Sequence, residues 1–351
     1  MQSPSKTLII RFSSVGDVVL TTPLLRALRE AFPNSQIDYV TRKEYAELIQ
    51  TNHNLNVTWA LDASTGISGL RALKQKLRAE QYDLVIDLHG SLRSRYLRRG
   101  LGARRALTID KRIFRRWLFV NLKKNTYPGI VSVADRYIEP LHSFGIRNDG
   151  KGLELHISDD LLFGVSGKVA SRKLHRFEKI LGLCPAARHA TKEWPADRFV
   201  EVAARFCREK NGAVMIFGGI SDVGRCEEIV RQISDRIEPE RIISWAGELS
   251  LMESAAMMEY CDVILTNDSG LMHIAAAMKK RLIAIFGSTV REFGFAPVSD
   301  HAVVLEIKGL YCRPCSHVGR SACPKGHFRC MKEIEAESAL DEIRTLVKDS
   351  H

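Results

Sequence analysis

Two successive series of short apolar runs, each followed by segments with helical periodicity, constrain the fold of this chain more than any other feature. The runs of the first series cover residues 7–12, 36–41, 57–61 and 82–88, and those of the second cover 180–184, 213–217, 241–244, 263–265 and 282–286. Strands that alternate with helices are typical of parallel sheets with helices on both faces. The sequence therefore predicts an α/β protein with two Rossmann-like domains.

The segments between these runs supply the predicted helices and the domain limits. Helical periodicity covers residues 18–32, 42–50, 68–80, 158–177, 195–210, 222–234, 250–260, 271–278 and 333–347. A loop of Gly, Asn and Asp at 145–152 precedes the second series, and 351 residues suffice for two cores. We expect an N-terminal domain at 1–165 and a C-terminal domain at 166–331. The last segment, 332–351, is expected to form a helix that packs back on the first domain.

Composition excludes several classes of protein. Hydrophobic residues make up 45% of the chain, which is typical of a globular protein rather than a disordered one. No apolar run approaches the ~20 residues that a membrane span needs. The start of the chain lacks the apolar core of a signal peptide, and the eight cysteines are then expected to be reduced. These features predict a cytoplasmic protein.

The net charge of +11 lies entirely in the first part of the chain. Residues 1–150 hold 24 Lys and Arg against 13 Asp and Glu, whereas 151–351 hold 28 of each. Within 112–124, a helix would place Phe114, Trp117, Leu118 and Leu122 on one face and most basic residues on the others, which is the composition of an interfacial helix. A helix packed on its own domain is the alternative. The charge predicts an anionic partner: a phosphorylated substrate, a membrane surface or nucleic acid.

The run 263–273 predicts a ligand site, because a buried strand leads through three N-cap residues into a helix. Ligands of open α/β sheets bind at this edge, and a helix N-terminus favours phosphate. Asn267, Asp268 and Ser269 are the three N-cap residues; Asp268 could also accept hydrogen bonds from ribose hydroxyls, and Gly270 permits close approach of the backbone. His273, in the first turn, could reach a pyrophosphate. An ordinary capped helix with a solvent-facing histidine is the alternative.

Three further residues follow predicted strands at the same kind of edge. Lys192 lies in the loop before Trp194-Pro195, where it is either a solvated charge or a cation for a departing diphosphate. Asp17 follows the first strand and either caps the first helix or acts as a general base. Asp222 is a weaker candidate for binding ribose.

A cysteine pattern near the end of the chain leaves two interpretations open. The pattern is C-x2-C-x7-C-x6-C, with two histidines close by, and its members are Cys312, Cys315, Cys323 and Cys330. One C-x2-C pair is compatible with a zinc knuckle, but the second pair lacks the usual spacing. Plain reduced thiols are the alternative.

Three motifs, in order along the chain, resemble those of the heptosyltransferases of glycosyltransferase family 9. They are Ser13–Asp17, Lys192–Pro195 and Thr266–His273, the last followed by Ala275–Ala277 and Ile285–Thr289. The resemblance implies the GT-B architecture, in which two Rossmann-like domains with parallel sheets face a central cleft. It implies an inverting enzyme that moves heptose from ADP-heptose to the inner core of lipopolysaccharide. The acceptor would be a phosphorylated, Kdo- or heptose-terminated lipid A core at the cytoplasmic face of the inner membrane.

The resemblance also implies roles for individual residues. Asp17 matches the proposed general base of the family and Lys192 its phosphate-binding lysine, while Asp268, Ser269, Gly270 and His273 would bind the donor. No D-x-D motif lies near these elements, so we expect no metal. We also expect no cofactor, no nucleic-acid partner and a monomer. The similarity is greatest to type II members, because type I members have threonines where this chain has 187–188. Alternatives are a GT-B-fold sugar-nucleotide epimerase and a basic nucleic-acid-binding protein.

Overall fold

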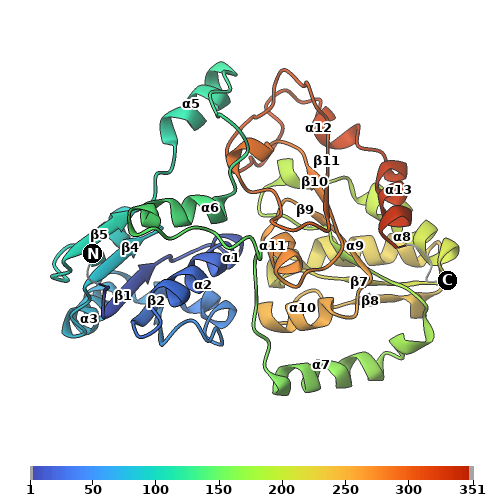
Figure 1. The fold of residues 1–351 in the computed structure, drawn as a ribbon. Coiled ribbons are helices and arrows are strands. Elements are labelled where there is room, and N and C mark those ends of the chain that lie inside the picture. Colours follow the sequence, from blue (N-terminus) through green and yellow to red (C-terminus); the bar gives the residue numbers. More distant parts are fainter. Residues whose placement is uncertain (1–2, 348–351) are drawn as a thin grey trace. The chain divides into compact units, whose positions relative to one another are not determined.

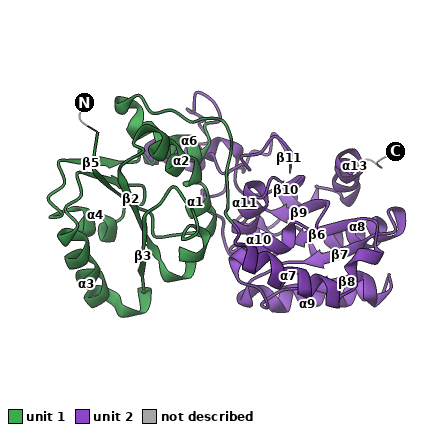
Figure 2. Ribbon diagram, turned by 60° about the horizontal axis from the view of Figure 1, so that its bottom comes forward, with its two compact units in different colours: residues 1–112, 131–156 green, residues 113–130, 157–351 purple. Residues whose placement is uncertain are grey.

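The computed structural model describes residues 3–347, and its contacts group them into two compact units (Figures 1 and 2). Unit 1 holds the chain up to residue 112 together with 131–156. Unit 2 holds 113–130 and the chain from 157 onwards. The segment 113–130 was predicted within the first domain, but it packs with unit 2 through contacts described below. Each unit contains one parallel sheet, so the predicted α/β class with two parallel sheets is confirmed.

Unit 1 is built on a five-stranded sheet in the order β3-β2-β1-β4-β5. Its strands are β1 (Lys6–Ile10), β2 (Gln36–Arg42), β3 (Val57–Leu61), β4 (Leu84–Asp87) and β5 (Arg105–Thr108). Its α-helices are α1 (Val15–Val19), α2 (Thr22–Ala31), α3 (Gly66–Ala79), α4 (Leu92–Arg98) and α6 (Val133–Ile138). The central strand β1 pairs in parallel with both β2 and β4, and Leu8, Ile9 and Ile10 are fully buried. The loops after these three strands therefore share one edge of the sheet.

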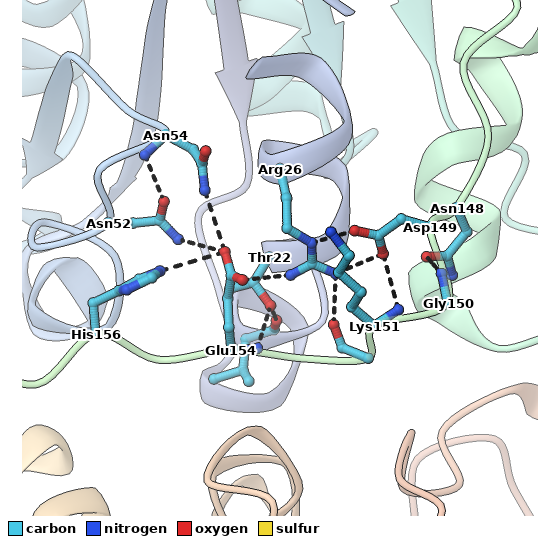
Figure 3. Close-up of polar contacts among 12 residues, drawn as sticks. Thr22, Arg26, Asn52, Asn54, Asn148, Asp149, Gly150, Lys151, Glu154 and His156 are labelled. Atoms are coloured by element: carbon cyan, nitrogen blue, oxygen red, sulfur yellow. Dashed lines mark hydrogen bonds and ion pairs between the residues drawn. The ribbon is translucent and has the colours of Figure 1, made fainter. Parts of the chain in front are cut away.

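A polar network holds the end of unit 1 to α2 (Figure 3). Arg26 on α2 donates to Asp149 at 2.7 Å and forms an ion pair with Glu154. Glu154 also accepts hydrogen bonds from Asn52 and Asn54, and its backbone N–H donates to Thr22. Hydrogen bonding to Arg26 lowers the pKa of Asp149, so this carboxylate stays charged at neutral pH. The segment that precedes unit 2 is thus fixed to unit 1 by charge-assisted hydrogen bonds.

Unit 2 is built on a six-stranded parallel sheet in the order β11-β10-β9-β6-β7-β8. Its strands are β6 (Ile180–Cys184), β7 (Ala213–Ile216), β8 (Ile242–Ser244), β9 (Val263–Asn267), β10 (Leu282–Phe286) and β11 (Ala302–Glu306). Its α-helices are α5 (Ile113–Leu122), α7 (Asp159–Ser171), α8 (Ala196–Glu209), α9 (Val223–Ser234), α10 (Leu251–Met258), α11 (Gly270–Ala277), α12 (Arg329–Lys332) and α13 (Ala336–Leu346). Side chains of α8, α9 and α13 form one core cluster with the central strands.

Three expectations about helices are corrected by the structure. The helix expected at 18–32 is broken into α1 and α2, because Pro23 has no N–H to continue the first helix and instead begins the second. The segment 42–50 forms only a short 3₁₀ helix, Lys43–Leu48. The last helix, α13, packs on α8 in unit 2 rather than on the first domain, because Ala339, Leu340 and Ile343 are buried in that core. Between residues 3 and 347, no helix is long and apolar enough to cross a membrane.

Candidate functional site

The turn between β9 and α11 lies at the carboxyl edge of the sheet in unit 2, as predicted. Asp268 directly follows β9 and is only 5% exposed, and its backbone N–H donates to the carbonyl of Ile285 on β10. Ser269 is the N-cap residue of α11, and Gly270 is the first residue of that helix. The backbone N–H groups of the first turn have no partner within the helix, which makes its start a place for an anion.

Lys192 and Asp268 form a direct ion pair in unit 2. Lys192 Nζ lies 2.7 Å from Asp268 Oδ2, and their side chains are 15% and 6% exposed. The same carboxylate oxygen accepts a 2.7 Å hydrogen bond from the hydroxyl of Thr289, which follows β10. An ammonium group is thereby held beside the start of α11. The sequence placed both charged residues at one edge, but it gave no indication that they contact each other or Thr289.

The loop that carries Lys192 is joined to β9 by a second pair of contacts. Asn267, the last residue of β9, accepts from the backbone N–H of Trp194 at 3.0 Å and donates to the carbonyl of Pro185 at 2.8 Å. Trp194 is fully buried, and its indole N–H donates to the carbonyl of Ile334. The K-x-W-P and T-N-D-S-G motifs therefore form one connected structure, in which buried hydrogen bonds set the position of the lysine.

Two candidate residues have surroundings that differ from the expectation. His273 is 3% exposed, so the alternative of a solvent-facing histidine is wrong. Asp222 accepts a 2.9 Å hydrogen bond from the backbone N–H of Gly219, and this contact gives it a local role in the turn after β7. Thr191, which the sequence analysis did not single out, is buried and accepts hydrogen bonds from Ser288 and from the backbone of Arg320.

In unit 1, Asp17 is held by four groups. Arg11 Nη2 lies 2.6 Å from Asp17 Oδ1, and the phenol of Tyr137 donates to the same oxygen at 3.2 Å. The backbone N–H and hydroxyl of Ser14 donate to Oδ2, both at 3.0 Å, so Asp17 also completes a capping box at the start of α1. Ser14 is thus the N-cap residue, and Asp17, at the third position of the helix, supports the cap from within; a catalytic role for Asp17 is compatible with this position.

The charge state of Asp17 follows from these contacts. Burial alone would raise its pKa, but the charge of Arg11 and the hydrogen bonds from Ser14 outweigh burial and lower it. Burial also raises the pKa of Tyr137, which keeps this phenol protonated as a donor. Asp17 is therefore a carboxylate at neutral pH, with a lower proton affinity than a free aspartate.

A cavity of about 320 Å³ lies at the carboxyl edge of the sheet in unit 1. Its lining includes Phe12 after β1, Arg42 at the end of β2, His89 after β4 and Arg93 on α4. Burial, followed by the charges of Arg11 and Lys111, lowers the pKa of His89 to about 4, so its imidazole is neutral at pH 7. Two arginines against one carboxylate, that of Asp62, give the lining a net positive charge, which suits an anionic ligand.

The four cysteines near the end of the chain are free thiols, and three of them are buried. Cys312 Sγ lies 3.7 Å from His327 Nε2, whereas Cys330 belongs to the core cluster of unit 2. Within the described range 3–347, no three His, Cys, Asp or Glu side chains are grouped so that they could hold a metal ion.

Comparison with known proteins identifies the family. The sequence model described as "Glycosyltransferase family 9 (heptosyltransferase)" matches residues 70–325, which is most of the chain. The chain belongs to glycosyltransferase family 9. The predicted family and the predicted enzyme class, a glycosyltransferase, are both confirmed. The matched range includes Lys192 and the whole segment from Asp268 to His273, whereas Asp17 lies before it.

Curated relatives match this family 9 chain over almost its full length. The lipooligosaccharide heptosyltransferase 2 of Haemophilus influenzae is 27% identical and covers 97% of this chain and 99% of its own. The lipopolysaccharide heptosyltransferase 2 of Escherichia coli is 26% identical and covers 97% and 98%. The lipopolysaccharide heptosyltransferase 3 of E. coli is 25% identical and covers 79% and 81%.

Solved structures confirm the predicted GT-B fold class. A glycosyl transferase family 9 protein from Veillonella parvula has a TM-score of 0.80 at 25% identity and covers 99% of this chain and 98% of its own. E. coli ADP-heptose LPS heptosyltransferase II has a TM-score of 0.71 at 22% identity, with coverage of 97% and 98%. A putative UDP-N-acetylglucosamine 2-epimerase from Listeria monocytogenes has a TM-score of only 0.52 at 12% identity. The family match and the curated heptosyltransferase relatives do not favour the epimerase alternative.

Proposed function

We propose that this family 9 enzyme transfers heptose from ADP-heptose to the inner core of lipopolysaccharide, with inversion at the transferred carbon. The observation that carries the proposal is the family match over 70–325, because this range contains both donor-side motifs, which the Lys192–Asp268 ion pair joins. Full-length relatives named lipopolysaccharide or lipooligosaccharide heptosyltransferase 2 support the same substrates. The basic N-terminal half and the arginine-lined cavity of unit 1 suit a phosphorylated acceptor.

Unit 2 would bind the donor. The diphosphate of ADP-heptose would lie at the start of α11, against the backbone N–H groups of Ser269 and Gly270 and the ammonium of Lys192. Asp268 would hold Lys192 in position to donate to the diphosphate and would itself accept a hydrogen bond from a ribose hydroxyl. As ADP departs, negative charge grows on its terminal phosphate, and a cation already in position lowers the barrier. His273, which is buried, would support the first turn of α11 from within.

Unit 1 would bind the acceptor and supply the general base. The acceptor hydroxyl attacks C1 of the donor sugar and must lose a proton, and Asp17 is the carboxylate proposed to take it. The pairing with Arg11 makes Asp17 a weak base in the ground state. A weak base suffices when proton transfer follows bond formation, because the hydroxyl becomes acidic as it bonds to an oxocarbenium-like carbon. Arg42 and Arg93 would bind acidic groups of the acceptor.

The proposed place of action is the cytoplasmic face of the inner membrane, where the enzyme would work as a peripheral monomer without a cofactor or nucleic acid. A direct test is mass spectrometry of the lipopolysaccharide core from a strain that lacks this protein. The core should end one residue earlier, at Kdo or at the first heptose, and the wild-type gene should restore it. A core of normal mass and composition would contradict the proposal.

A further inference from the structure

The helix α5 presents its apolar face outward. Ile113, Phe114, Trp117 and Leu122 are 51–70% exposed, and none of the residues of the helix is buried. Helices on globular proteins ordinarily turn this face toward the core. This apolar face is therefore available to a binding partner that is not part of residues 3–347.

The opposite face of α5 is firmly attached to unit 2, so the exposure does not reflect a loose helix. Phe119 contacts the buried ring of Phe293 with centroids 6.0 Å apart, and Tyr127 packs on the same ring at 6.3 Å. Lys123 Nζ donates to the carbonyls of Cys312 at 3.1 Å and Pro314 at 2.6 Å. The contacts of Lys123 join the end of α5 to a second segment, 307–332, which is exposed in part.

The two segments form one surface with a distinctive composition. A cavity of about 520 Å³ lies where they meet and is lined by Phe119, Lys123 and Ile130 from one side and by Lys308 and Tyr311 from the other. Both segments carry large exposed apolar side chains. Besides those of α5, they are Ile130, Tyr311 and Val318, which are 54%, 66% and 46% exposed. We call this the α5 surface.

The two segments of the α5 surface carry basic charge only, while Glu292 and Glu306 line the cavity between them. Residues 113–130 and 307–332 together contain ten Lys and Arg and no Asp or Glu. Arg115, Lys124, Arg320 and Lys325 are exposed, whereas Arg313 is buried and paired with Glu306. In the rest of unit 2, acidic and basic residues are mixed. A surface that is both basic and rich in exposed aromatic side chains matches the headgroup region of an anionic bilayer, where cations bind lipid phosphates and Trp and Tyr rest at the interface.

We infer that the α5 surface binds anionic phospholipid bilayers. The inference rests on the proposed function in one respect: binding there would bring the enzyme to its membrane-held acceptor. It differs from the sequence-based expectation in two respects. The surface belongs to unit 2, the proposed donor unit, and a segment from the end of the chain completes it. Lys123 links its two parts.

Vesicle binding by the full chain tests the inference. Flotation with vesicles of phosphatidylethanolamine and phosphatidylglycerol should recover the wild-type protein, whereas pure phosphatidylcholine should not. Arg115→Glu with Arg116→Glu, and separately Phe114→Ser with Trp117→Ser, should each reduce binding at least about tenfold. All four side chains are at least partly exposed, so both variants should fold. Binding should also weaken as salt rises.

Matched controls on unit 2 separate this surface from general charge and hydrophobicity. Arg231→Glu with Arg236→Glu makes the same change of charge at exposed sites on and after α9, and Phe163→Ser removes an aromatic side chain that is 81% exposed. Both controls should bind vesicles within about twofold of the wild type. Failure of the wild type to bind, or equal losses in the controls, would overturn the inference. So would loss of a wild-type dimer in the Phe114→Ser, Trp117→Ser variant, because a second copy would then cover the face.

Heptose transfer to a deacylated, water-soluble core acceptor distinguishes this inference from the proposed function. The variants of the α5 surface should transfer heptose to this acceptor at wild-type rates while failing to bind vesicles. Transfer without vesicle binding by the wild type would refute the α5 surface and leave the function standing. Vesicle binding without transfer would refute the proposed function and leave membrane binding by the α5 surface standing.

Discussion

Lys192 Nζ lies 2.7 Å from Asp268 Oδ2, although the two residues come from loops that are far apart in the chain. The lysine is thus held in position by a carboxylate at the edge of the sheet where a nucleotide is expected. Binding of a nucleoside diphosphate should therefore depend on this ammonium, whereas binding of adenosine, which carries no phosphate, should not.

Lys192→Met should weaken ADP binding at least tenfold, a loss of about 1.4 kcal/mol, because a side chain of similar length loses its charge. Binding of adenosine, which lacks phosphate, should change by less than about twofold. Calorimetric titration with both ligands checks this. Lys179→Met, which breaks an ion pair with Asp262 elsewhere in unit 2, is the control and should leave ADP affinity intact. Equal losses for ADP and adenosine would show that Lys192 only supports the loop.

Asp268→Ala should also weaken ADP binding at least tenfold, since the variant loses both a ribose acceptor and the partner that positions Lys192. A lysine that is only 15% exposed and has lost its counter-charge should lower the melting temperature as well. The control is Glu259→Ala, because Glu259 is an exposed acid paired with Lys280 in the same unit. Tighter binding of ADP by Asp268→Ala would contradict the account, because Asp268 would then merely compete with the diphosphate for the lysine.

His89 should make the stability of the protein depend on pH. Its pKa is about 4 in the folded chain and near 6.5 when unfolded. Above pH 6.5 the imidazole of His89 is neutral in both the folded and the unfolded chain, so it does not make stability depend on pH there. Between pH 6.5 and 4, His89 is protonated in the unfolded chain but not in the folded chain, so the free energy of unfolding decreases as pH falls. His89→Asn should therefore reduce the loss of melting temperature between pH 7.5 and 5.0. The control His301→Asn, at an exposed histidine, should not reduce this loss. An equal pH dependence of the melting temperature in all three proteins would refute the role of His89.

Arg11 should set the pH range in which Asp17 is active. Arg11→Met removes the positive charge that lowers the pKa of this carboxyl, while burial continues to raise it. The acidic limb of the kcat/KM profile should therefore move up by about one pH unit or more. Arg104→Met, at a side chain that is 78% exposed, is the control and should leave the profile unchanged. An unmoved acidic limb in the Arg11 variant would mean that Asp17 does not titrate in catalysis.

The strands were the most predictable part of the fold. β3, β6 and β10 have the predicted limits, because their apolar runs are bounded by polar residues and turns. The basic stretch 91–124 was less predictable: it contains α4 and β5, whose apolar pattern is obscured by arginines. The outward apolar face of α5 also has no local sequence signal, because the same periodicity usually indicates a buried face.

The candidate site was predictable in its residues but not in its contacts. The strand–turn–helix pattern indicated Asp268, and the resemblance added Lys192, yet their pairing depends on two loops that meet across β6 and β9. The pairing of Arg11 with Asp17 is similar, because it requires an arginine at the end of β1 to turn back toward α1. An asparagine at 17 could still accept from the backbone N–H of Ser14, but it would leave Arg11 without its counter-charge, at a cost of roughly 1–3 kcal/mol.

The central claim is that this chain transfers heptose with Asp17 as the base, and a single assay tests it most directly. Purified wild-type protein and Asp17→Asn are incubated with ADP-heptose and with either a Kdo-terminated or a heptose-terminated acceptor. The masses of the products are then measured by mass spectrometry. The wild type should add one heptose to one of the two acceptors. The variant, still folded and binding ADP within about twofold of the wild type, should do so at least ~10²-fold more slowly. Absence of transfer by the wild type, or near-normal transfer by Asp17→Asn, would contradict the account.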